Sequence, residues 1–190
     1  MADRANLPPD HTIVHPNRAK TASKVTRAIV IAILLASVGL MMIVTIGGWS
    51  KLEGLKPINF AWCIAYLLLA GYVARWSRGA LPIAAALAML LLIVALIAGT
   101  GLSGTSWFDR NGYGFAAPRT IFGGKGLSAG TLGYLTLLMV PLQAALILFA
   151  MRGFAQGWNV EADAVTGGPE AQVDQWRKSP ARPPRRTTAG

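Results

Sequence analysis

Charged residues are scarce in this chain, and its four longest hydrophobic runs contain none. Asp, Glu, Lys and Arg make up 14% of the 190 residues, whereas ordinary globular domains contain about 25%. None of these residues, and no His, occurs in residues 28–46, 58–74, 81–98 or 130–151. Ion and proton pathways through membranes usually need an ionisable group at depth, so a proton-coupled transporter is not expected.

Residues suited to catalysis or metal binding are also few. Cys63 is the only cysteine, which excludes an intrachain disulfide and a paired-thiol redox site. His11 and His15 are four residues apart, but their segment is flanked by proline and supplies no third ligand. Residues 123–125 resemble part of a phosphate-binding loop, except that Gly126 replaces the required Ser or Thr. We therefore expect no enzyme activity, no catalytic residues, no metal and no cofactor.

Long uncharged runs are the main feature that the chain does have. Residues 81–98 contain no charge, amide or hydroxyl group, and about 18–20 such residues cross a hydrocarbon layer roughly 30 Å thick. This run and three similar ones predict an all-α membrane protein, a bundle of four transmembrane helices. The helices are expected at about 28–49, 58–76, 81–99 and 130–151, with a flexible tail at 1–27, an outer loop at 100–129 and a mostly disordered tail at 152–190.

The basic residues predict how the chain is oriented in a cell membrane. There are 18 Lys and Arg against 8 Asp and Glu, a formal net charge of +10. Thirteen of the 18 lie in the two tails and in the connection between the second and third runs. Because cytoplasmic segments carry the excess of Lys and Arg, both termini are expected in the cytoplasm. This placement argues against nucleic acid as a partner, and the abundance of Ala, Gly and Arg hints at a bacterial cytoplasmic membrane.

Small residues repeat along three of the predicted helices. Lipid provides no hydrophobic drive between helices, so small residues that allow close backbone approach are typical of helix interfaces. The alternative is that alanine is simply abundant. The predicted packing stripes are Ala84, Ala88, Ala95 and Gly99 in the third helix, Ala28, Ala32 and Ala36 in the first, and Ala61 and Ala65 in the second.

Pro141 and Gln143 interrupt the fourth hydrophobic run. Proline lacks a backbone N–H, so it should kink the helix and leave a carbonyl group for a neighbour or a water to satisfy. Gln143 at the kink could join Asn59, Tyr66 and Thr136 in a polar pathway. That pathway is the alternative functional hypothesis, a small transporter or channel component that works as an oligomer.

The predicted outer loop, residues 100–129, combines many glycines with several aromatic residues. Such a loop could contact a partner, or it could be an interfacial lid that seals the ends of the helices. We expect a non-enzymatic accessory or interaction subunit of a larger membrane complex, whose partners are the lipid bilayer and either other membrane subunits or further copies of itself. The candidate contact residues are Trp107, Phe108, Asp109, Arg110, Tyr113 and Phe115.

Overall fold

The fold is given by a computed structural model that describes residues 11–52, 55–100, 108, 121, 123, 124 and 126–165. Four helical segments in this part of the chain are long and apolar enough to cross a membrane, which confirms the prediction of four such helices. They are α2 (Thr21–Gly47), α3 (Lys56–Ala74), α4 (Ala80–Thr100) and the end-to-end pair α5 (Ala129–Leu137) and α6 (Met139–Ala155).

The first long helix begins at Thr21, earlier than the predicted start at residue 28. Its first two turns carry Lys24, which is exposed, and Thr26, which is buried. The Thr26 hydroxyl accepts a hydrogen bond of 2.9 Å from Gln156 Nε2 beyond the end of α6. This tertiary contact favours helix in a stretch whose composition resembles that of a tail.

The fourth span is interrupted at Leu138, between α5 and α6. Pro141 cannot donate to the carbonyl of Leu137, and its ring crowds that same group, so regular helix is disfavoured one turn before the proline. At the other end of α5, the hydroxyl of Ser128 accepts a 3.1 Å hydrogen bond from the backbone N–H of Thr131 and caps the helix.

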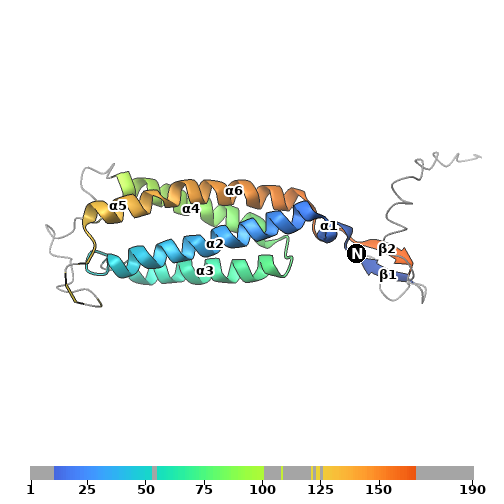
Figure 1. Ribbon diagram of the computed structural model, residues 1–190, viewed down its shortest axis with the longest axis horizontal. Coiled ribbons are helices and arrows are strands. Elements are labelled where there is room, and N and C mark those ends of the chain that lie inside the picture. Colours follow the sequence, from blue (N-terminus) through green and yellow to red (C-terminus); the bar gives the residue numbers. More distant parts are fainter. Residues whose placement is uncertain are drawn as a thin grey trace, which may run out of the picture.

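The long helices form an elongated bundle in which α4 lies along α6 and α2 lies along α3 (Figure 1). Helix α2 also packs against α6, which joins the two pairs. Helices α3 and α4 follow one another in the chain, yet their contact is much less extensive than that of α4 with α6. The bundle is therefore least tightly closed between α3 and α4.

The core runs along the length of the bundle and includes Leu34, Tyr66, Leu81, Leu146 and Trp158, all fully buried. A smaller apolar cluster lies at the end where α2 stops and α3 begins. The outward faces are also apolar, because many large hydrophobic side chains on α2, α3, α4 and α6 are about half exposed.

Two short strands join the chain's two tails at the opposite end of the bundle (Figure 1). Strand β1 (His11–Val14) pairs antiparallel with β2 (Ala162–Val165), and the short helix α1 (Pro16–Ala19) follows β1. The sequence predicted no regular structure in either of these stretches. The additional order has a tertiary cause, since Asn17 Nδ2 donates to Gly157 O at 3.0 Å and Arg18 Nε donates to Trp158 O at 3.2 Å.

Candidate functional site

The centre of the bundle contains a hydrogen-bonded group of three uncharged side chains, Ser37, Tyr66 and Gln143. They come from α2, α3 and α6, and each is fully buried, with 0% of its surface exposed. The hydroxyl of Tyr66 donates to Gln143 Oε1 at 2.8 Å, and Gln143 Nε2 donates to Ser37 Oγ at 2.9 Å. We call this group the polar clamp, because it joins three helices through side chains alone.

The side chains of the polar clamp bond to one another and to one backbone carbonyl group. The Ser37 hydroxyl donates in turn to the carbonyl of Ile33 at 2.8 Å, so both hydroxyl donors and both ends of the Gln143 amide are used. A buried polar group that keeps its partners avoids the cost of desolvation. The arrangement is suited to holding helices in register, and none of its three side chains is charged.

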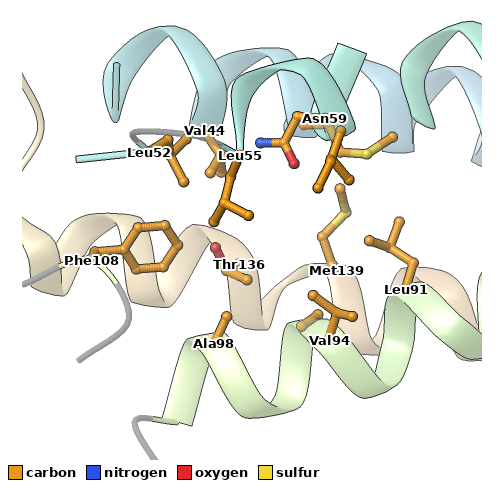
Figure 2. Close-up of a pocket in the computed structure, with 13 residues that line it drawn as sticks. Val44, Leu52, Leu55, Asn59, Leu91, Val94, Ala98, Phe108, Thr136 and Met139 are labelled. Atoms are coloured by element: carbon orange, nitrogen blue, oxygen red, sulfur yellow. The ribbon is translucent and has the colours of Figure 1, made fainter. Parts of the chain in front are cut away.

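A second polar group lies nearer the end where α2 stops. Asn59 Nδ2 donates to Thr45 Oγ1 at 3.1 Å, and that hydroxyl donates to the carbonyl of Met41 at 2.7 Å. Thr136 is nearby, and its buried hydroxyl has no hydrogen-bond partner in the described part of the chain. These residues adjoin a cavity of about 130 Å³ that is lined by side chains from all four spans (Figure 2).

The residues predicted to form a polar pathway therefore belong to two separate groups. Tyr66 and Gln143 are part of the polar clamp, whereas Asn59 and Thr136 line the cavity. Met139 is in contact with both groups, since it lines the cavity and its Sδ is 3.8 Å from Gln143 Nε2.

The predicted small-residue stripe of the third helix faces the bundle interior. Ala84, Ala88 and Ala95 on α4 are buried, and α4 packs along α5 and α6. At Gly99 the backbones come so close that an added Cβ would lie 2.6 Å from Leu137 Cγ and 3.2 Å from Gly133 O. A side chain larger than hydrogen does not fit there unless the Leu137 side chain or α5 moves.

The predicted stripe of the first helix faces the opposite way. Ala28, Ala32 and Ala36 are exposed on the outer surface of α2. The stripe was expected to pack within the chain; instead the buried face of α2 contains Val30, Leu34, Ser37, Met41 and Val44. In the second helix, Ala61 is exposed and Ala65 is partly buried.

Phe108 is the single candidate contact residue of the 100–129 loop that falls within the described residues. Its ring is 2% exposed and packs in the smaller apolar cluster with Val44, Leu52 and Leu132. This ring is therefore part of the bundle's end and does not lie on the surface. The other five candidates, Trp107, Asp109, Arg110, Tyr113 and Phe115, lie outside the described residues.

Basic side chains gather at the end of the bundle where α3 and α6 stop. Arg27 donates to the carbonyl of Ala74 at 3.2 Å and stacks 4.1 Å from the ring centre of Trp76. Arg78 donates to the carbonyl of Phe154 at 2.9 Å and lies 4.2 Å from the centre of its ring. Cations at the C-terminal ends of helices stabilise the free carbonyl groups and the helix dipole.

Fold and site together define a helical protein with four candidate membrane spans and an uncharged, internally hydrogen-bonded interior. Among the described residues, no group of three or more His, Cys, Asp or Glu side chains could hold a metal ion. Compared with family models, with curated proteins and with solved structures, the chain matches none of them.

Proposed function

We propose that this protein is a multi-pass protein of the cell membrane and a non-enzymatic interaction subunit of a larger membrane assembly. The observation that carries the proposal is the outer face of α2. Ala28, Ala32 and Ala36 recur there at every fourth position, and all three are exposed. Nothing described lies within 4 Å of a Cβ added at Gly39, one turn further along the helix. A helix of a partner subunit could approach this face closely.

The membrane location is supported by the outward apolar faces of the bundle. Leu68 on α3 and Leu148 on α6 are 58% and 71% exposed, which is unfavourable in water at about 25 cal/mol per Å² of apolar surface. The described ends of both tails lie at the basic end of the bundle. By the excess of Lys and Arg, that end is the cytoplasmic one.

The alternative, a small transporter or channel component, has less support. It would need polar atoms that are free to contact a solute along a continuous path. Tyr66 and Ser37 both bond to Gln143 and Ser37 also bonds to the carbonyl of Ile33, whereas Asn59 bonds to Thr45 in a separate group.

Copurification from the native membrane tests the proposal. The full-length protein, affinity-tagged and extracted in a mild detergent, is expected to bring down a stoichiometric membrane partner. The double variant Ala32→Leu/Ala36→Leu should reduce the partner's recovery at least tenfold, because two added side chains keep the backbones apart. The matched control, Ala61→Leu/Ala86→Leu, makes the same change at exposed positions on α3 and α4 and should recover the partner normally.

Two readouts complete this experiment. The thermal midpoint of each variant in detergent should equal that of the unmodified protein, since all four alanines are exposed in the bundle. A homogeneous homo-oligomer without a second component would contradict the subunit hypothesis. Equal partner recovery with both double variants would show that the α2 face is not the interface.

A further inference from the structure

The cavity near Asn59 lies where the bundle is least tightly closed. Helices α3 and α4 are joined by a short connection at one end. The cavity is lined by the beginning of α3 and the last turns of α4, which are the ends furthest from that connection. Ile58 and Val94 line it from these two helices and are 53% and 49% exposed. The cavity therefore borders the apolar flank of the bundle between α3 and α4.

Two polar atoms in the cavity have hydrogen-bonding capacity to spare. The hydroxyl of Thr136 is buried and has no partner among the described residues. The Asn59 amide donates through Nδ2 to Thr45, and its carbonyl oxygen Oδ1 is an acceptor with two lone pairs. Figure 2 shows Thr136 and Asn59 on opposite sides of the same space, which is otherwise lined by apolar side chains such as Leu55, Leu91 and Met139.

This combination specifies the chemistry of a ligand. The Asn59 oxygen can accept a hydrogen bond, and the Thr136 hydroxyl can donate one. An alcohol has both functions, because its O–H can donate a hydrogen bond and its oxygen can accept one. No charged side chain among the described residues lines the cavity, so an ionised head group would lack a counter-charge from this part of the chain, which is strongly unfavourable.

The size of the cavity limits how much of the ligand it can hold. A cavity of roughly 150 Å³ with apolar walls is large enough for one benzene ring. The volume of about 130 Å³ found here therefore accommodates the hydroxyl group and the first few carbons of a chain. The remainder of a longer molecule would extend between α3 and α4.

We propose that this cavity is a binding site for the hydroxyl end of an uncharged, membrane-dissolved alcohol, which enters sideways between α3 and α4. Lateral entry rests on the proposed membrane location, but the site does not depend on a partner subunit. The Thr136 hydroxyl, which has no partner in the described part of the chain, gains one when the alcohol binds.

Photolabelling of the purified full-length protein in lipid nanodiscs tests this site. The probe is an octanol that carries a diazirine, and its comparison is the same diazirine-bearing chain without the hydroxyl group. The octanol probe should label cavity residues of α3 and α4 at least five times more strongly, and excess octanol should compete where octane does not. Ala98→Leu, which fills the cavity, should reduce the labelling at least fivefold.

Thr136→Val keeps the shape of the side chain and removes the hydroxyl, so it should also reduce labelling at least fivefold. Its matched control is Thr100→Val, the same change at an exposed position near the end of α4. Without alcohol, the thermal midpoint of Thr136→Val should be equal to or higher than that of the unmodified protein, because an unpaired buried hydroxyl is removed. A merely structural hydroxyl would instead lower the midpoint.

Three results would overturn the proposal: equal labelling by the two probes, labelling confined to residues outside the cavity, or full labelling of Thr136→Val. Equal labelling would mean that lipid chains enter without recognition of a hydroxyl group. Because the protein is tested alone in nanodiscs, the absence of a copurifying partner would leave these outcomes unchanged. If the proposed membrane location is wrong, the protein will be missing from the membrane fraction of cells. That result is seen before purification, so it is distinguishable from failure of the binding site.

Discussion

At the scale of single residues, Gln143 links its own helix to two others. Its amide oxygen accepts from Tyr66 on α3 and its amide nitrogen donates to Ser37 on α2. One uncharged side chain on α6 therefore positions two other helices. Hydrogen bonds of this kind between membrane helices contribute modestly, about 0.6 kcal/mol each on average and up to about 1.7 kcal/mol.

A double-mutant cycle on the polar clamp measures this contribution. Tyr66→Phe removes one hydroxyl and should lower the free energy of unfolding by about 0.6–1.7 kcal/mol. Gln143→Leu should cost more, because it leaves both Tyr66 and Ser37 without their partner. The two effects should be less than additive. Unfolding in mixed detergent micelles with increasing sodium dodecyl sulfate gives the required free energies.

The control for this cycle is Tyr134→Phe. Tyr134 is on α5 and is 75% exposed, so loss of its hydroxyl should leave the free energy of unfolding unchanged. If Tyr66→Phe and Tyr134→Phe behave alike, the clamp's hydrogen bonds do not stabilise the bundle.

Sequence reasoning identified one part of the clamp and missed another. An amide such as Gln143 in an apolar run is conspicuous, and Tyr66 stood out in the least apolar of the first three runs. Ser37 did not, because a serine within a helix can bond to its own backbone, as Ser37 also does with Ile33. The pairing depends on how α2 is rotated relative to α6, and composition alone does not specify that rotation.

At the scale of whole helices, the sequence predicts how long each helix is. It predicts only in part which face of each helix is buried. The length of an uncharged run is set by the thickness that it must cross, and all four runs became helices. A helix that is apolar on every side has no polar face to mark its outside. The small residues of α4 face inward while those of α2 face outward, although the two patterns look alike in the sequence.

Two glycine substitutions distinguish the effect of close helix packing on the free energy of unfolding from the effect of helix propensity. Gly99→Ala places a Cβ against Leu137 and the backbone oxygen of Gly133, so it should lower the free energy of unfolding by about 1–3 kcal/mol. In Gly71→Ala the added Cβ meets nothing within 4 Å, and the substitution should stabilise α3 by up to about 1 kcal/mol. The same detergent titration measures both. A Gly99→Ala variant that is as stable as the unmodified protein, or more stable, would contradict the close approach of α4 and α5.

At the scale of the whole molecule, the strand pair places the described ends of both tails at one end of the bundle. An even number of spans has the same consequence, and the excess of Lys and Arg predicts that this end is cytoplasmic. The positions of the helices follow from hydropathy. The pairing of β1 with β2 could not be foreseen, because it joins two segments of only four residues that are far apart in the sequence.

Reporter fusions test the proposed orientation. Green fluorescent protein fused after Gly190 should fluoresce, and alkaline phosphatase at the same position should be inactive, because it requires the oxidising side of the membrane to form its disulfides. Both reporters inserted after Gly124, which is exposed in the 100–129 segment, should give the reverse pattern. Active alkaline phosphatase after Gly190 would show that the C-terminus lies outside the cytoplasm, the reverse of the proposed topology.

The pairing of β1 with β2 also has a consequence for biogenesis. Strand β1 leaves the ribosome before any of the four long helices, and β2 leaves after all of them. Chains begin to fold from their N-terminal part during synthesis, but β1 must wait without its partner until the last helix has been made. Closure of the strand pair is therefore a late step, and antibodies or proteases directed at residues 11–14 would distinguish unfinished chains from finished ones.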